Sequence, residues 1–384
     1  MLPAYAGRSI LNVVTSLTAQ LGLPPATAPF SAPEWQEGGL LEGVERVLLF
    51  VVDGLGHYLL KRHIERGEMP WLTEQLAAED SGWSYTTATS TLPSSTMTAL
   101  TTMHTGVPPA QHGWLGTTVF QGKTVIDLLR QTDVLAAKPL PDPNTLIFVP
   151  SVYRRLHDIG VSSGYVSPAA YEGQFLDHFY FDGGTAFRYG PHASLPLQVA
   201  NAAAQSGSVQ SGAVPARYVM SYWPDYDTTN HIHGPQSEAS AQAAGTVDTL
   251  IRHTLDALPR DGHTLLVVTA DHGQRVTPLG EVVSVGTVEA PPAGENRLRY
   301  FTHEPQGLSA GVTVRLSADL WAEGLFGGPP ARLEFLERTG TYTATVQDAA
   351  QLTHDYGAGP LILKGNHGGW SAEEMVVPVL SIRL

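Results

Sequence analysis

Residues 46–54 read RVLLFVVDG, an unbroken apolar run that ends at Asp53 and Gly54. Continuous apolarity, without alternating polar residues, is typical of a strand buried on both faces, as in a parallel sheet covered by helices. Similar runs recur at residues 218–222, 265–269 and 375–382. The sequence therefore predicts an α/β protein, a three-layer sandwich with a central, mostly parallel sheet.

Helical patterns lie between these strands. Residues 236–258 carry apolar side chains at helical spacing, and residues 94–104 form a shorter candidate helix that ends near a glycine. Residues 277–350 differ, with short β-like pieces and loops rich in Gly and Pro. We expect one catalytic domain over residues 1–384, with a candidate lid or subdomain inserted within residues 277–350.

The composition narrows the classes of function. The chain has 384 residues, a formal net charge of -14 and only 22 Lys and Arg, which argues against a broad nucleic-acid surface. An acidic protein still binds an anionic substrate where metal ions invert the local charge. The chain has no cysteine, which excludes disulfides and thiolate catalysis, so a transition-metal site must use His and carboxylate ligands.

The sequence also bears on location. No window reaches the length of a membrane span, and the N-terminal residues read as a short helix of the mature protein, without the long apolar stretch of a signal peptide. We therefore expect a cytoplasmic protein that does not bind membranes. The oligomeric state is not readable from the sequence.

Two polar residues follow the strand predicted at residues 218–222. Asp227 and His231 are four residues apart, so on a helical turn both side chains point to one side and could share a metal ion. A helix-starting Asp beside an unrelated His is the alternative reading. Asp225 competes for the same role, but its six-residue distance to His231 fits a shared turn less well.

Two more of the apolar strands are also followed by polar residues. Asp53 follows the strand at residues 46–52 and is itself followed by Gly54. Asp271 and His272 follow the strand at residues 265–269 and are followed by Gly273. In open α/β sheets ligands bind at the carboxyl ends of strands, so these side chains are candidates for one site. His367 lies in the Gly-rich segment GNHGG, which is flexible enough to aim an imidazole inward.

A hydroxyl nucleophile is expected near residues 86–96, a segment rich in Ser and Thr. Metal coordination is one way to obtain an alkoxide near neutral pH. Helix capping explains the same hydroxyls equally well. The residues alone leave four candidates open, which are Thr91, Ser94, Ser95 and Thr96.

These segments stand in the order found in the alkaline phosphatase superfamily, and the chain resembles its nucleotide pyrophosphatase/phosphodiesterase branch. The matching motifs are VVDG ending at Gly54, P-S-S-T at residues 93–96, T-G-x-x-P-x-x-H-G at 105–113, D-x-x-x-H-x-x-G-P at 227–235, ADHG at 270–273 and G-x-H-G at 365–368. The resemblance extends from about residue 46 to the C-terminus, and it implies an alkaline-phosphatase-like fold. The nine-residue step from Thr96 to Thr105 also fits, and it selects Thr96 as the nucleophile.

The resemblance implies two zinc ions, with Mn²⁺ or another divalent transition metal as an alternative. One ion would be held by Asp227, His231 and His367. The other would be held by Asp53, Asp271 and His272, with Thr96 bridging towards it. Attack by Thr96 on phosphorus would then give a phospho-threonine that water cleaves.

The chain departs from this branch at two positions. Its phosphodiesterases usually carry an Asn about five residues after the His of the H-G pair, where it donates to a phosphoryl oxygen. Here Thr117 stands at that spacing from His112, and it is our candidate substrate-binding residue. The residue after the nucleophile, often aromatic in nucleotide-cleaving relatives, is Met97, which weakens the case for base stacking.

The leading hypothesis is thus a phosphodiesterase or nucleotide pyrophosphatase that acts on a small-molecule phosphate ester. A phosphomonoesterase or a phosphonate hydrolase of the same superfamily is the alternative. A sulfatase is disfavoured because the [CS]-x-P-x-R setting of its nucleophile is missing. The alternative from a different class is a non-catalytic zinc-binding protein that kept the fold, and the presence of all six proposed metal ligands argues against such decay.

Overall fold

The computed structural model describes residues 1–36, 39–140, 146–173, 177, 182–204, 216–278, 280–285, 290–309, 311–346, 348–357 and 359–384. Its centre is a seven-stranded sheet in the order β2-β19-β10-β1-β9-β7-β8. The strands of this sheet are β1 (Arg46–Val52), β2 (Ser84–Thr89), β7 (Ser163–Pro168), β8 (Thr185–Tyr189), β9 (Tyr218–Trp223), β10 (Thr264–Thr269) and β19 (Val376–Arg383).

Five neighbouring strands of this sheet, β10, β1, β9, β7 and β8, run parallel to one another. Strand β19 is antiparallel to both β10 and β2, so β2 again points in the direction of the parallel strands. All six residues of β9 and of β10 are buried. The predicted mostly parallel, doubly covered sheet is confirmed.

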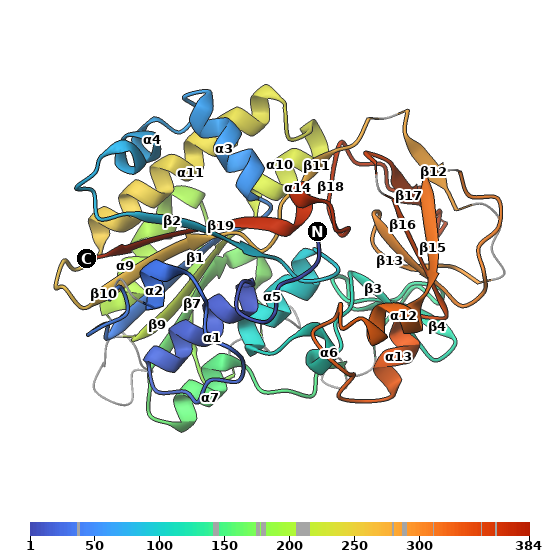
Figure 1. Ribbon diagram of the computed structural model, residues 1–384, viewed down its shortest axis with the longest axis horizontal. Helices are drawn as coiled ribbons and strands as arrows, with labels where there is room; N and C mark the ends of the chain where they lie inside the picture. The colour runs from blue at the N-terminus through green and yellow to red at the C-terminus, as the bar shows by residue number, and fades with distance from the viewer. Residues whose placement is uncertain are drawn as a thin grey trace.

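Helices cover both faces of this sheet (Figure 1). Helices α3, α4 and α11 lie on one face, and α1, α5 and α7 lie on the other. The helices of the described chain are α1 (Ile10–Gln20), α2 (Pro33–Gln36), α3 (His57–Glu65), α4 (Pro70–Ala77), α5 (Thr96–Thr105), α6 (Pro109–His112), α7 (Val152–Asp158), η2 (Ala169–Tyr171), η3 (His192–Ser194), α9 (Leu195–Ala204), α10 (Asp225–His233), α11 (Glu238–Ala257), α12 (Ser317–Ala322), α13 (Glu334–Arg338) and α14 (Ala372–Met375).

The helix ends follow from local chemistry. Helix α11 begins after Ser237, whose side chain accepts a hydrogen bond from the backbone N–H of Ser240, close to the predicted start. Helix α5 begins at Thr96, because Ser95 has the extended backbone of an N-cap residue, and it ends at Gly106 with a left-handed φ of 63°. Thr96 is therefore the first helical residue, two positions later than the sequence pattern predicts.

A second sheet lies beside the central one (Figure 1). It has eight short strands in the order β15-β16-β14-β13-β3-β4-β5-β6, and every pairing in it is antiparallel. Its strands are β3 (Thr118–Gln121), β4 (Thr124–Asp127), β5 (Thr132–Asp133), β6 (Lys138–Pro139), β13 (Ala293–Gly294), β14 (Leu298–Phe301), β15 (Val312–Leu316) and β16 (Tyr342–Val346). Two small ribbons complete the described strands, β11 (Arg275–Val276) with β18 (Gly365–Asn366) and β12 (Val282–Ser284) with β17 (Gln351–Thr353).

The second sheet has an apolar core of its own, which includes Trp114, Phe120, Tyr300 and Phe335. It joins the segment predicted as a lid to residues 118–139, a pairing that the sequence pattern does not predict. Residues 279, 286–289, 310 and 347 of the predicted lid segment lie outside the described residues. The division of the chain into a catalytic domain and a lid stays a prediction.

None of the helices in the described parts of the chain combines the length and the apolar composition that crossing a bilayer requires.

Candidate active site

The predicted site residues come together at the carboxyl edge of the central sheet. Strand β1 lies between β9 and β10, with Val52 opposite Trp223 and Val51 opposite Thr269. The residues that follow these three strands therefore start from adjacent points of one edge. Asp53 directly follows β1, and Asp271 lies two residues beyond β10.

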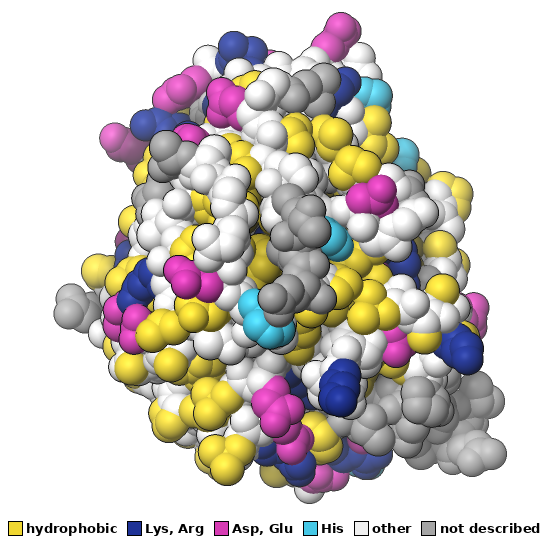
Figure 2. Space-filling model, turned by 90° about the vertical axis from the view of Figure 1, so that its right-hand side faces the viewer, with side chains coloured by type: hydrophobic (Ala, Val, Ile, Leu, Met, Phe, Trp, Pro, Cys, Tyr) yellow, Lys and Arg dark blue, Asp and Glu magenta, His cyan; other side chains and the backbone are white. Residues whose placement is uncertain are grey.

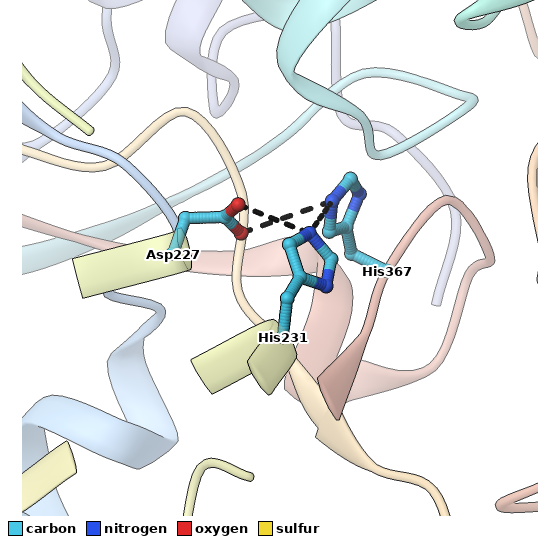
Figure 3. A group of neighbouring side chains, drawn as sticks. All are labelled: Asp227, His231 and His367. Atoms are coloured by element: carbon cyan, nitrogen blue, oxygen red, sulfur yellow. Dashed lines mark hydrogen bonds and ion pairs between the residues drawn. The ribbon is translucent and has the colours of Figure 1, made fainter. Parts of the chain in front are cut away.

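The first cluster comprises Asp227, His231 and His367 (Figure 3). Asp227 and His231 lie one turn apart on α10, and the His231 Nε2 atom is 3.0 Å from an oxygen of Asp227. His367 comes from the loop after β18, and its Nε2 atom is 3.8 Å from the other Asp227 oxygen. The shared helical turn predicted for Asp227 and His231 is confirmed.

The two imidazoles of this cluster turn their Nε2 atoms towards each other. The Nδ1 atom of His231 is 2.7 Å from the carbonyl oxygen of Gly365, and that of His367 is 3.1 Å from the carbonyl oxygen of Ser94. A carbonyl accepts only, so each Nδ1 carries the proton and, in the neutral ring, each Nε2 is an acceptor. These Nε2 atoms are 3.2 Å apart. A cation held between them and Asp227 would satisfy both, and carbonyl-anchored Nδ1 atoms are typical of metal-binding histidines.

The second cluster comprises Asp53, Asp271 and His272, all buried. The His272 Nε2 atom is 3.4 Å from Asp53 Oδ1 and 3.3 Å from Asp271 Oδ2. These same two carboxylate oxygens are buried without a hydrogen-bond partner. Buried carboxylate oxygens without partners are costly, and a divalent cation among these atoms would remove that cost.

The clusters share an excess of negative charge. Burial and the nearby carboxylates of Asp271 and Asp227 raise the pKa of Asp53 well above its ordinary value. The pKa of Asp227 is lowered despite its burial, because His231 lies beside it, and Asp227 in turn raises the pKa of His231 to about 8. Burial, together with the neighbouring His272, lowers the pKa of His367 well below its ordinary value, so its ring is neutral and free to act as a ligand.

Close packing around the two clusters depends on Gly54, which directly follows Asp53. Gly54 has a φ of +73°, and a Cβ at this position would lie 2.9 Å from an oxygen of Asp227. Its backbone N–H donates to Asp271 Oδ1 over 3.1 Å. A glycine is required there because both the left-handed backbone and the close approach to Asp227 exclude a larger residue.

Thr96 lies at the first turn of α5 and next to the second cluster. Its Oγ1 atom is 3.0 Å from His272 Nε2. The N-terminus of α5 places the positive end of the helix dipole beside this hydroxyl, which favours negative charge on its oxygen. Thr96 therefore lies both beside a cluster and at a helix N-terminus, and its role as the nucleophile stays a prediction.

The other three candidate nucleophiles of the sequence analysis lie in different surroundings. Thr91 donates to the carbonyl oxygen of Pro93 over 2.9 Å, and Ser94 donates to that of Gly369 over 2.6 Å. Ser95 forms the N-cap of α5. These three are buried, whereas Thr96 is partly exposed beside the clusters.

Asp225 does not join the first cluster. It is exposed at the first residue of α10 and lines an open groove of about 310 Å³, with Trp223 and His233 among its neighbours. Of the two aspartates that compete in the sequence, Asp227 is therefore the one beside His231, as the spacing predicts.

Three supporting residues were missed by sequence reasoning. The Tyr222 hydroxyl donates to Asp53 Oδ2, and the Gln274 amide donates to Asp227 Oδ1 and, over 3.2 Å, to the Asp227 carbonyl oxygen. Glu295, from the second sheet, accepts a hydrogen bond from the backbone N–H of Thr117 over 2.5 Å. The positions of Tyr222 at a strand end and of Gln274 after the A-D-H-G motif could have indicated two of them.

Thr117 lies at the margin of this site rather than within either cluster. Its N–H is hydrogen-bonded to Glu295 over 2.5 Å. The hydroxyl of Ser95, the residue before Thr96, also lies close enough to this carboxylate to favour its ionised form. A role for Thr117 in substrate binding stays a prediction.

The comparisons with known proteins point in one direction. A family model described as type I phosphodiesterase / nucleotide pyrophosphatase matches residues 47–292. A search of the curated proteins finds no match to this chain.

Solved structures share the fold. The structure of murine ectonucleotide pyrophosphatase / phosphodiesterase 5 is similar over 87% of this chain and 87% of its own, with a TM-score of 0.66 and 14% identity. An inactive variant of that protein in complex with AMP is similar over 88% and 87%, with a TM-score of 0.65 and 13% identity. Phosphonoacetate hydrolase from Sinorhizobium meliloti 1021, in complex with phosphonoacetate, is similar over 89% and 90%, with a TM-score of 0.60 and 17% identity. The predicted alkaline-phosphatase-like α/β fold is confirmed.

Proposed function

The chain belongs to the type I phosphodiesterase / nucleotide pyrophosphatase family, which makes it a hydrolase of phosphate esters, and we propose that it works with two zinc ions and a threonine nucleophile. The observation that most supports this proposal is the pair of clusters beside Thr96, whose Oγ1 atom is 3.0 Å from His272 Nε2. The preferred substrates are phosphodiesters or pyrophosphates of small molecules.

The residues of the two clusters fit divalent cations. Asp227, His231 and His367 would hold one ion, and a second set would hold the other. That second set is Asp53, Asp271 and His272, with Thr96 beside it. Both sets offer only nitrogen and oxygen donors, which suits zinc and, less specifically, Mn²⁺. When bound, the two ions would supply the positive charge that stabilises an attacking and a leaving oxygen.

The chain's own groups carry the covalent chemistry. The Thr96 hydroxyl loses its proton, and its oxygen forms a bond to phosphorus while the bond from phosphorus to the ester oxygen breaks and that oxygen leaves with a proton. Water then cleaves the phospho-threonine, which restores the hydroxyl and releases phosphate or its remaining monoester. The dipole of α5 favours the anionic oxygen of Thr96 throughout. Tyr222 and Gln274 hold Asp53 and Asp227 in orientation.

Other activities of the same superfamily are the alternatives. A phosphomonoesterase needs the same clusters, and a phosphonate hydrolase is favoured by the shared fold of the phosphonoacetate hydrolase. AMP bound to the murine variant supports a nucleotide as one substrate to test. A non-catalytic zinc-binding protein would need no hydroxyl beside His272. A cytoplasmic location and a lid role for the second sheet are further predictions.

Hydrolysis of two chromogenic substrates by one zinc-loaded sample tests this proposal. Bis-p-nitrophenyl phosphate is a diester and p-nitrophenyl phosphate a monoester with the same leaving group. Faster cleavage of the diester supports the phosphodiesterase. Faster cleavage of the monoester moves the enzyme to the phosphatase side of the superfamily. Zinc binding without turnover of either directs the search to phosphonates, and loss of the metal without loss of activity contradicts the proposal.

A further inference from the structure

Glu295 reaches from the second sheet to the margin of the active site. It lies at the tip of the β13–β14 hairpin, where its N–H donates to the carbonyl oxygen of Leu298 over 2.7 Å. The residue is buried, with 8% of its surface exposed. A buried carboxylate is rare unless it is paired or has a binding role, and Glu295 forms no ion pair within the described residues.

The carboxylate of Glu295 contacts both sides of the site. It accepts a hydrogen bond from the N–H of Thr117 over 2.5 Å, and the Ser95 hydroxyl, next to the proposed nucleophile, is close enough to favour its ionised form. Its stem packs against Gly368, where an added Cβ would lie 2.5 Å from the Glu295 Cβ atom. Because Gly368 follows the proposed ligand His367, the carboxylate lies between a neighbour of the nucleophile and a neighbour of a metal ligand.

The charge of Glu295 alters the balance at the site. The clusters contain three carboxylates, from Asp53, Asp227 and Asp271, against which two divalent cations would set four positive charges. While Thr96 keeps its proton, the single positive charge that results is cancelled by the carboxylate of Glu295. A phosphodiester brings one negative charge to this neutral site, whereas a phosphomonoester brings two near neutral pH.

We propose that Glu295 is a specificity-determining residue that disfavours doubly charged phosphomonoesters and thereby selects singly charged phosphodiesters. The inference rests on the proposed function, and it assigns to the second sheet a direct part in substrate choice. Repulsion is felt most by the substrate with the larger charge, because the Coulomb energy scales with the product of the two charges.

Glu295→Gln is the direct test, because the amide keeps the shape of the side chain and an oxygen that accepts from Thr117. We expect kcat/KM for p-nitrophenyl phosphate, relative to bis-p-nitrophenyl phosphate, to rise about tenfold. An unchanged ratio, or an equal loss on both substrates, overturns the proposal, since a merely structural role would lower both rates together. The matched control is Glu323→Gln, which removes an exposed charge paired with Arg315 in the second sheet and leaves the ratio unchanged.

A binding measurement on inactive protein separates this inference from the proposed chemistry. In zinc-loaded protein with Thr96→Ala, calorimetry compares AMP, a dianionic monoester, with dimethyl phosphate, a monoanionic diester. Adding Glu295→Gln is expected to lower the Kd of AMP about tenfold and to leave the Kd of dimethyl phosphate unchanged. Equal effects on both ligands, with zinc content intact, overturn the role of Glu295 alone. A wild-type protein that binds no zinc overturns the proposed function and this inference with it.

Discussion

The Nε2 atoms of His231 and His367 face each other at 3.2 Å, while the Nδ1 atom of each ring points to a backbone carbonyl oxygen. Two neutral imidazoles fixed in this way would present lone pairs to each other, so a proton on His231, whose pKa is raised to about 8 by Asp227, or a shared metal ion makes the arrangement favourable. Asp227 supplies the negative charge that either of these requires. The arrangement fits a cation held between the two rings and Asp227, as we propose.

The two clusters are expected to lose metal independently. His231→Ala removes one ligand of the first set and Asp271→Asn one of the second, so each variant should lose one of two zinc ions. Elemental analysis of the purified variants checks this. Retention of both ions with full activity in either variant would show that the ligand assignment is wrong.

Thr96→Ala should reduce turnover of bis-p-nitrophenyl phosphate by at least about a thousandfold, because it removes the attacking oxygen. Both metal ions should remain, since six other ligands are untouched. Thr96→Ser retains a hydroxyl at the first turn of α5 and should keep measurable activity. Unchanged turnover in the alanine variant would exclude Thr96 as the nucleophile.

Tyr222→Phe should weaken zinc binding by the second cluster about 10- to 100-fold, because the lost hydroxyl donates to Asp53. Competition with a chelator measures this affinity. The matched control is Tyr58→Phe, at a tyrosine that is 45% exposed. Equal zinc affinity in the Tyr222 variant and the wild type would assign the hydroxyl no part in holding Asp53.

The candidate site could be predicted from the sequence only in part. Asp53, Asp271 and His272 were predictable because each follows a fully apolar strand, and strand ends of a parallel sheet meet at one edge. Thr96 could be selected among its neighbouring hydroxyls only by family resemblance. Glu295 carries no signal in the sequence, because its hydrogen bond with the Thr117 N–H joins residues 178 positions apart in the chain.

The fold could also be predicted from the sequence only in part. The central strands were predictable because burial on both faces leaves a continuous apolar run. The second sheet was not, because its strands are short and residues 118–139 pair through β3 with β13, far along the chain. The antiparallel direction of β19 is also unreadable, since a buried strand has the same apolar run in either direction.

The buried ion pair of Arg297 and Glu374 should stabilise the loop that carries His367. Both side chains are fully buried, with a nitrogen-to-oxygen distance of 3.1 Å, and Glu374 also accepts from the N–H of Gly369. Arg297→Met should lower the free energy of unfolding by about 3–5 kcal/mol, because it leaves Glu374 buried without its partner. Denaturant unfolding measures this, with Arg315→Met as the control at a partly exposed arginine, for which a loss below about 1 kcal/mol is expected. A loss that small in the Arg297 variant would contradict the structural role.

The same pair predicts a pH dependence. Although burial alone would raise it, the pKa of Glu374 lies below its ordinary value of 4.5, because Arg297 and its hydrogen-bond donors favour the carboxylate. A depressed pKa in the folded state stabilises the protein above the unfolded pKa, and this contribution is lost as the pH falls through the folded value. The difference in unfolding free energy between wild type and Arg297→Met should therefore be larger at neutral pH than well below pH 4.5. A difference that grows in acid would contradict this assignment.

The zinc content of the purified wild-type protein, measured together with its turnover of bis-p-nitrophenyl phosphate before and after chelation, tests the central claim most directly. We predict two zinc ions per chain, loss of activity when a chelator removes them, and recovery when zinc is restored. A protein that binds no divalent metal, or that remains fully active after its metal has been removed, would contradict the account.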